Sequence, residues 1–99
     1  MTNSEISLIF TDIVEMLALK KENIFKVRAY RKVARTIGEL KEPVAKLAAE
    51  NRLKEIPGAG EAITKKLTEL VATGKLAFYE KLKAELKERS PSAPLSGAA

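Results

Sequence analysis

The sequence predicts an all-α fold, a compact bundle of four to five short helices. Apolar residues recur at helical spacing in five segments, the alternation typical of strands is absent, and no segment repeats at a fixed period. A chain of 99 residues can enclose one modest core. We expect residues 1–89 to form a single domain. Residues 90–99, SPSAPLSGAA, have the composition of a flexible tail or linker.

The first helix is expected to run to about Lys20. Asn3 or Ser4 can cap it, because a short polar side chain accepts hydrogen bonds from the free N–H groups of the first turn. Its apolar face comprises Ile6, Ile9, Phe10, Ile13, Met16 and Leu17.

The second helix is expected to begin at Phe25, with Asn23 as its cap, and it carries two different faces. One stripe is apolar and comprises Val27, Tyr30, Ala34 and Ile37. The other is basic and comprises Arg28, Arg31, Lys32 and Arg35, at positions i, i+3, i+4 and i+7. Phosphate contact and simple solvation both explain the basic stripe.

A short third helix follows, with Pro43 in its first turn, where no N–H donor is needed. Its inward residues are Val44, Leu47 and Ala48.

A tight turn is predicted at Pro57, Gly58 and Gly60, because this composition does not continue a helix. A fourth helix starts directly after the turn, with Ile63, Leu67, Leu70 and Val71 at helical spacing, and Gly74 suits a left-handed C-terminal cap. The last helix is expected from Leu76 to Lys87, with Phe78, Tyr79, Leu82 and Leu86 as its apolar residues and local Lys–Glu pairs on its exposed face.

Composition excludes several kinds of chemistry. Cysteine and histidine are both absent, so disulfides, zinc sites and histidine acid–base catalysis are excluded. The acidic residues are scattered, without the cluster that divalent-metal phosphoryl transfer needs, and polymerase activity is therefore not expected in this chain. The first ten residues lack the features of a signal peptide, and no apolar run approaches the length of a membrane span. We expect a cytoplasmic protein without membrane contact.

The net charge of +5 is unevenly distributed. Residues 1–19 carry acids and no base, whereas residues 24–37 carry bases and no acid. This asymmetry indicates a surface that faces a polyanion.

The turn at residues 56–62 has the chemistry of a phosphate site. The N-terminus of a helix presents unpaired N–H groups and a partial positive charge, and glycine lets a phosphate approach the backbone closely. No strand precedes the turn, and no Gly-Lys-Ser/Thr sequence ends it, so dinucleotide and Walker-type nucleotide sites are not expected. We therefore predict binding to a nucleic-acid backbone.

Two segments resemble a known family. They read IPGAGEAITKKLTELVATGKL and FKVRAYRKVARTI, and they resemble the N-terminal helix-hairpin-helix domain, of lyase type, of family X DNA polymerases, in particular polymerase beta-like members of the bacterial branch. The resemblance covers about residues 4–87. It implies non-sequence-specific binding to DNA at gaps, nicks or 5′-phosphate ends in DNA repair. It also implies a C-terminal polymerase domain as a partner if the chain is a fragment.

The resemblance assigns roles to particular residues. It implies a phosphate pocket of Lys26, Tyr30 and Lys54, and phosphate contacts from the amides of Gly58, Gly60 and their neighbours Ala59, Glu61 and Ala62. The main-chain carbonyls of Lys54, Ile56 and Ala59 would hold a monovalent cation, Na⁺ or K⁺, and no other cofactor is required. Arg28, Arg31, Arg35, Lys65 and Lys66 complete the predicted DNA-contacting residues. Tyr30 has two interpretations, stacking on a sugar or base and packing in the core.

In lyase-active members a lysine forms a Schiff base with the opened abasic sugar, and Lys66 matches that lysine. Its position at the edge of the apolar stripe suits a sheltered nucleophile, and equally a lysine that extends from the rim of a core. Three positions depart from the lyase pattern: Ala62 replaces a pocket lysine, Lys65 a glutamate and Phe78 a basic residue. Simple DNA binding, deoxyribose-phosphate lyase activity and a helical protein-interaction domain therefore stand as alternative functions.

Overall fold

The computed structural model describes residues 1–89, and the predicted linker at residues 90–99 lies outside the described residues. As predicted, the described chain is entirely helical and contains no strand. Its elements are α1 (Asn3–Leu19), α2 (Ile24–Glu39), α3 (Val44–Ala49), the 3₁₀ turn η1 (Leu53–Glu55), α4 (Glu61–Thr73) and α5 (Ala77–Arg89).

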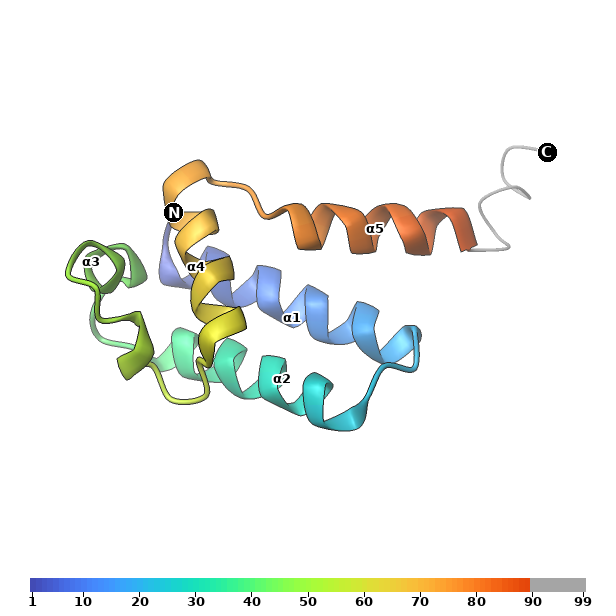
Figure 1. Cartoon of the computed structure of the whole chain (residues 1–99), viewed down its shortest axis with the longest axis horizontal. Coiled ribbons are helices and arrows are strands. Elements are labelled where there is room, and N and C mark those ends of the chain that lie inside the picture. The colour runs from blue at the N-terminus through green and yellow to red at the C-terminus, as the bar shows by residue number, and fades with distance from the viewer. Residues whose placement is uncertain (90–99) are drawn as a thin grey trace.

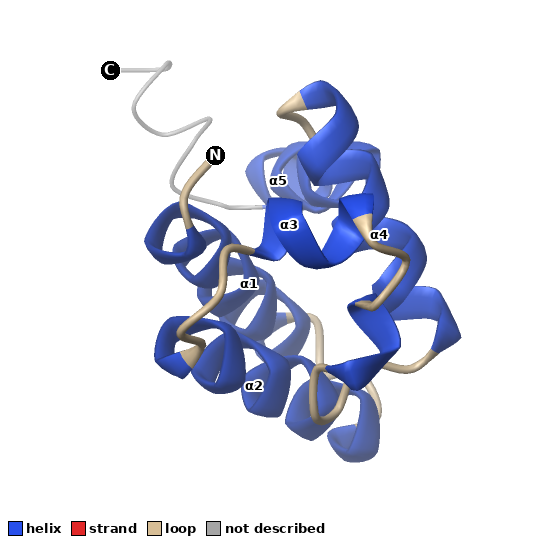
Figure 2. Ribbon diagram, turned by 90° about the vertical axis from the view of Figure 1, so that its left-hand side faces the viewer, coloured by secondary structure: helices blue, strands red, loops and turns tan. Residues whose placement is uncertain are grey.

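The helices α1 and α2 form an antiparallel pair, with α5 lying along α1 (Figure 1). The helix α4 runs at a steep angle to this pair (Figure 1). Figure 2 shows α3 and α4 together beside the α1–α2 pair. The turn between η1 and α4 is therefore presented at the side of α2.

The helix ends differ in part from the sequence prediction. Asn23 caps α2 as expected, with Oδ1 accepting from the Phe25 amide at 2.8 Å, although the helix begins one residue earlier, at Ile24. The predicted caps of α1 are wrong, because Thr2 caps that helix and forms a reciprocal pair of hydrogen bonds with Glu5.

Asn3 instead joins α1 to the start of α3. Its Oδ1 accepts from the Val44 amide at 2.8 Å, and its Nδ2 donates to the Glu42 carbonyl at 2.9 Å. Pro43 directly precedes α3 rather than lying within its first turn. Gly74 ends α4 in the left-handed conformation, with φ at 75°, as predicted.

One hydrophobic core joins all five helices. Most of the apolar residues predicted to face inward are buried, whereas Ile9, Met16, Ala48, Val71, Phe78 and Tyr79 are partly buried at its edge. Several core residues were not predicted from the sequence, and these are Val14, Val33, Leu53, Ile56 and Leu76. Among residues 1–87 no polar or charged residue is buried. The charged groups of residues 1–87 therefore lie at the surface.

The helix α5 is attached to α1 by two polar contacts. The Tyr79 hydroxyl donates to Asp12 Oδ2 at 2.7 Å, and Lys20 Nζ lies 2.7 Å from Glu85 Oε1. The expected local pairing on α5 is present between Lys83 and Glu80, whereas Glu85 also reaches across to α1. Within the described part of the chain, no helix has the length and apolar character needed to cross a membrane.

Candidate nucleic-acid interface

The glycine turn lies against α2. Gly58 has φ at +90°, a conformation that side-chain-bearing residues rarely adopt. A Cβ placed there would lie 3.2 Å from the Lys32 side chain and 3.3 Å from Val33 Cγ2. The turn therefore meets α2 at Lys32, within the predicted basic stripe.

The turn leaves a group of backbone amides without protein acceptors. The Ala59 amide is occupied, because it donates to the Ile56 carbonyl at 3.0 Å. The first α4 amide with a helical acceptor is that of Thr64, which donates to Gly60. Five amides at the turn donate to no acceptor among the described residues. They are the amides of Gly58, Gly60, Glu61, Ala62 and Ile63. All of these residues except Ile63 are exposed, so the α4 N-terminus offers free donors to an anion.

The four basic residues of α2, here called the basic face, are exposed. They are Arg28, Arg31, Lys32 and Arg35. None of them forms an ion pair with a residue in the range 1–89. Because the Lys32 side chain packs beside Gly58, the free amides and the basic face lie next to each other.

Phe25 lies at the N-terminal end of the basic face. Its side chain is 73% exposed, and its position is i−3 from Arg28 and i−7 from Lys32. No role for Phe25 was predicted from the sequence, although its place outside the apolar stripe of α2 was a detectable signal. An exposed aromatic ring within a basic surface suits stacking on an unpaired base.

A hollow of about 460 Å³, here called the lysine hollow, adjoins the turn on its other side. Its walls include Lys26, Tyr30, Gly60, Ala62, Lys66 and Phe78. The resemblance implied a pocket of Lys26, Tyr30 and Lys54, whereas the structure places Lys26 and Tyr30 in this hollow with Lys66. The other two predicted lysines lie outside its walls. Lys54 is exposed on η1, and Lys65 is exposed and 3.5 Å from Glu61.

Lys66 is the sheltered lysine of α4, as predicted. Its pKa is lowered, first by burial and then by the neighbouring Lys26, while Glu69 opposes the change. Its ammonium lies 4.6 Å from the centre of the Phe78 ring, which favours the charged form. Phe78 therefore opposes part of the lowering of the Lys66 pKa. A basic residue at position 78 would instead lower this pKa further.

Tyr30 serves the core through its ring. Phe10 and Phe78 stack on its two sides, each with a ring centre 5.9 Å away, and only 4% of the residue is exposed. Burial raises the pKa of Tyr30 to about 12. Of the two interpretations of Tyr30, the geometry favours core packing over stacking on DNA. The hydroxyl makes no hydrogen bond with any residue of the described chain and stays available at the hollow.

The three carbonyls assigned to a monovalent cation have free acceptor capacity. The carbonyls of Lys54 and Ala59 accept no hydrogen bond from the described residues, and that of Ile56 accepts only one, from Ala59. Residues 1–89 hold no group of three acidic side chains that suits a multivalent metal. Binding of Na⁺ or K⁺ at these carbonyls stays a prediction.

These features define a small helical domain that offers main-chain amides and basic side chains to an anionic backbone. Residues 1–76 match the family described as the helix-hairpin-helix domain. The chain belongs to this family. Such domains in general bind DNA without sequence specificity, and this chain is accordingly a DNA-binding domain. The helix α5, with Phe78, lies beyond the matched residues.

Proposed function

We propose that this domain binds DNA at gaps, nicks and 5′-phosphorylated ends and acts in DNA repair. The observation that carries the proposal is the set of free amides at the α4 N-terminus, flanked by Lys32 on one side and by the lysine hollow on the other. An intact duplex offers only internal phosphodiesters, whereas a strand end adds a terminal phosphate with a further negative charge. A hollow that holds two lysine ammonium groups favours the terminal phosphate.

The contacts divide between phosphates and bases. The amides of Gly58, Gly60, Glu61 and Ala62 hold a phosphodiester, and Lys26 and Lys66 hold the terminal phosphate in the hollow. Arg28, Arg31, Lys32 and Arg35 follow the backbone, with Lys54 and Lys65 at the periphery. Phe25 stacks on a base that the gap leaves unpaired. The carbonyls of Lys54, Ile56 and Ala59 hold Na⁺ or K⁺, which adds positive charge beside the phosphodiester.

The preference for a terminal phosphate is tested with two gapped duplexes of equal sequence, one with a 5′-phosphate and one with a 5′-hydroxyl. Fluorescence anisotropy gives both affinities over a range of salt concentration. We expect tighter binding to the phosphorylated gap and a steep loss of affinity with salt, about 0.9 in the log–log slope for each duplex phosphate contacted.

Lys26→Ala supplies the sharper comparison, with Lys83→Ala on α5 as a control of equal charge. Lys26→Ala should reduce the preference for the phosphate, whereas Lys83→Ala should preserve it. Equal affinity of the parent protein for the two gaps would contradict the proposed end specificity. Affinity that does not change with salt concentration would contradict binding through the phosphates of the DNA backbone.

The half-buried Lys66 favours a second function, deoxyribose-phosphate lyase activity. Its lowered pKa increases the fraction of neutral amine near neutral pH. The amine would attack the C1′ aldehyde of an opened abasic sugar, and loss of water would give an imine. Removal of a C2′ proton would then expel the 3′-phosphate by β-elimination, and hydrolysis of the imine would restore the lysine.

Borohydride trapping on gapped DNA with a 5′-deoxyribose phosphate tests this chemistry. A covalent adduct should form with the parent protein and with Lys65→Ala, and it should be lost with Lys66→Ala. Because the reactive species is the neutral amine, trapping should increase as pH rises toward the lowered pKa of Lys66. Absence of an adduct with the parent protein would reject the lyase and leave the binding proposal intact.

If the chain is a fragment, we propose a C-terminal polymerase domain as its partner, on the basis of the resemblance to family X polymerases. The binding domain would then hold the downstream side of a gap while that domain fills it.

A further inference from the structure

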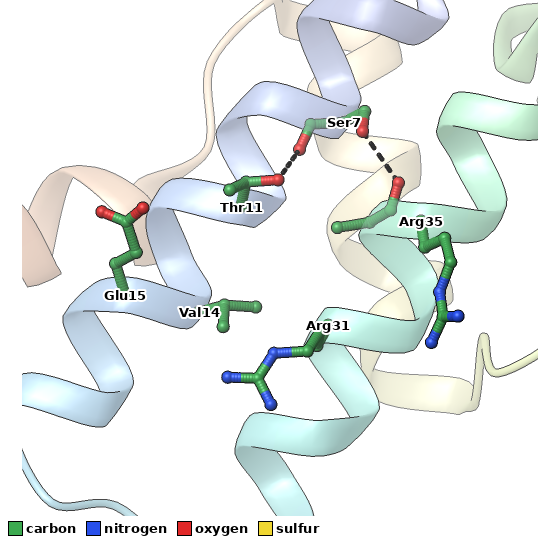
Figure 3. Close-up of a pocket in the computed structure, with 7 residues that line it drawn as sticks. Ser7, Thr11, Val14, Glu15, Arg31 and Arg35 are labelled. Atoms are coloured by element: carbon green, nitrogen blue, oxygen red, sulfur yellow. Dashed lines mark hydrogen bonds between the residues drawn. The ribbon is translucent and has the colours of Figure 1, made fainter.

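A groove of about 380 Å³, here called the α1–α2 groove, lies between α1 and α2 (Figure 3). Val14 and Ala34 give it an apolar floor. Arg31 and Arg35 line it from α2, and Glu15 lines it from α1. Figure 3 shows Arg31 extending from α2 toward α1. The groove therefore combines an apolar surface with charges of both signs.

The charged groups that line this groove come from two adjacent helices and are unpaired. Arg31, Arg35 and Glu15 form no ion pair with any residue from 1 to 89. A ligand that carries both an anionic group and an N–H donor would satisfy all three charges at once.

Two hydroxyls line the same groove as acceptors. The Ser7 hydroxyl donates its hydrogen to the Ala34 carbonyl at 2.8 Å, and the Thr11 hydroxyl donates to the Ser7 carbonyl at 2.9 Å (Figure 3). Because each hydroxyl has one hydrogen, both present only lone pairs to a ligand. They add to the preference for a ligand with N–H donors.

The groove is continuous with the proposed DNA-binding surface. Arg31 and Arg35 belong to the basic face, and Lys32 of that face contacts the hairpin turn at Gly58. A strand that leaves the turn and follows the basic face therefore reaches the groove. This continuity favours a nucleotide over a peptide or a free amino acid.

We propose that the α1–α2 groove binds one unpaired nucleotide of the DNA strand that follows the basic face. Arg31 and Arg35 contact its phosphate, the base lies over Val14 and Ala34, and Glu15 accepts a hydrogen bond from an exocyclic amino group. This site rests on the proposed DNA binding and extends it to the recognition of a base.

The site discriminates between the two pyrimidines. Cytosine presents an N4 amino group, which Glu15 and the two hydroxyls can accept. Thymine presents the O4 carbonyl at the same place, and the lone pairs of O4 repel a carboxylate that approaches the single neighbouring donor, N3–H. Cytosine is therefore preferred over thymine.

Labelled single strands of ten deoxycytidines and ten thymidines test this preference with the full chain. We expect the parent protein to bind the cytosine strand about fivefold more tightly, a modest share of the discrimination available to a well-formed base contact. Glu15→Gln should reduce the ratio to within about twofold, because an amide also donates to thymine O4. Glu39→Gln removes an exposed acid beside the basic face and is the matched control. It should raise both affinities equally and leave the ratio unchanged.

Arg31→Ala and Arg35→Ala test the phosphate contact. Each substitution should reduce by about 0.7 the steepness with which log affinity for a single strand falls against log salt concentration. Thermal unfolding should be unchanged, because both side chains are exposed and unpaired.

The outcomes separate this site from the proposed function. Salt-insensitive or absent binding of gapped DNA would reject both. Salt-dependent binding with no preference for cytosine, or a preference that survives Glu15→Gln, would overturn the groove site alone.

Discussion

Two glycines of the hairpin turn allow folding and DNA binding to be separated. Gly58→Ala should destabilise the fold, because φ at +90° strains a residue with a Cβ and the methyl group would press on Lys32 and Val33. We expect a loss of about 2 kcal/mol in the free energy of unfolding. For a domain of this size such a loss lowers Tm by about 8–16 °C.

Gly60→Ala should leave the fold nearly unchanged. Gly60 has φ −79° and ψ −173°, which alanine adopts without strain, and no atom lies within 4 Å of the added Cβ. Alanine is a weaker N-cap than glycine, which lowers stability. Alanine also has less conformational freedom in the unfolded chain, which raises stability by about 0.4–1 kcal/mol and offsets the weaker cap. The net change in stability should stay within about 0.5 kcal/mol.

The effect of Gly60→Ala on DNA should be much larger. The methyl group would keep a phosphate from the amides of Gly60 and Glu61, and loss of one hydrogen bond to a charged oxygen costs about 1.5 kcal/mol or more. Affinity for a phosphorylated gap should therefore fall about tenfold. Thermal unfolding gives the stability of the Gly58→Ala and Gly60→Ala variants, and fluorescence anisotropy gives their affinity for DNA. Parent-like affinity in Gly60→Ala would refute a direct role of these amides.

Three further predictions concern the surface. Arg28→Ala combined with Arg35→Ala should lower the salt slope on gapped duplex by about 1.8, two contacts at about 0.9 each, and an unchanged slope would remove these residues from the interface. Phe25→Ala should weaken binding to gapped DNA more than to intact duplex, because only the gap offers an unpaired base, and an equal effect on both would exclude stacking. The hydrogen bonds of Lys46 and Arg52 lower the pKa of Glu42, so the stability that they add is present above pH 4.5 and is lost as pH falls through the lowered value. Arg52→Gln should flatten this acid-side loss in pH-dependent thermal unfolding, and an unaltered pH profile would count against the network.

Local pattern was sufficient to predict most of the fold. The apolar repeats placed all five helices, and the glycines placed the hairpin turn and the end of α4, because both signals act over a few residues. The cap of α1 was wrong because neighbouring Thr2, Asn3 and Ser4 have similar capping ability. Asn3 is used instead by a partner 41 residues away in the chain.

The candidate site was predicted less completely, because it depends on how the helices pack. Periodicity showed that α2 has a basic face, but not that the Lys32 side chain packs beside Gly58 or that Arg31 and Glu15 line one groove. Pattern alone did not decide whether Tyr30 packs in the core or contacts a ligand. The rings that stack on it come from two other helices, Phe10 from α1 and Phe78 from α5.

Nuclear magnetic resonance of the backbone amides tests the central claim most directly. During titration with 5′-phosphorylated gapped DNA, the amide signals of Gly58, Gly60, Glu61 and Ala62 should shift strongly downfield as they donate to a phosphate oxygen. The amide of Gly74, which donates to Leu70 at the far end of α4, should stay in place. Saturated DNA binding with the four turn amides unmoved would contradict phosphate recognition by the hairpin.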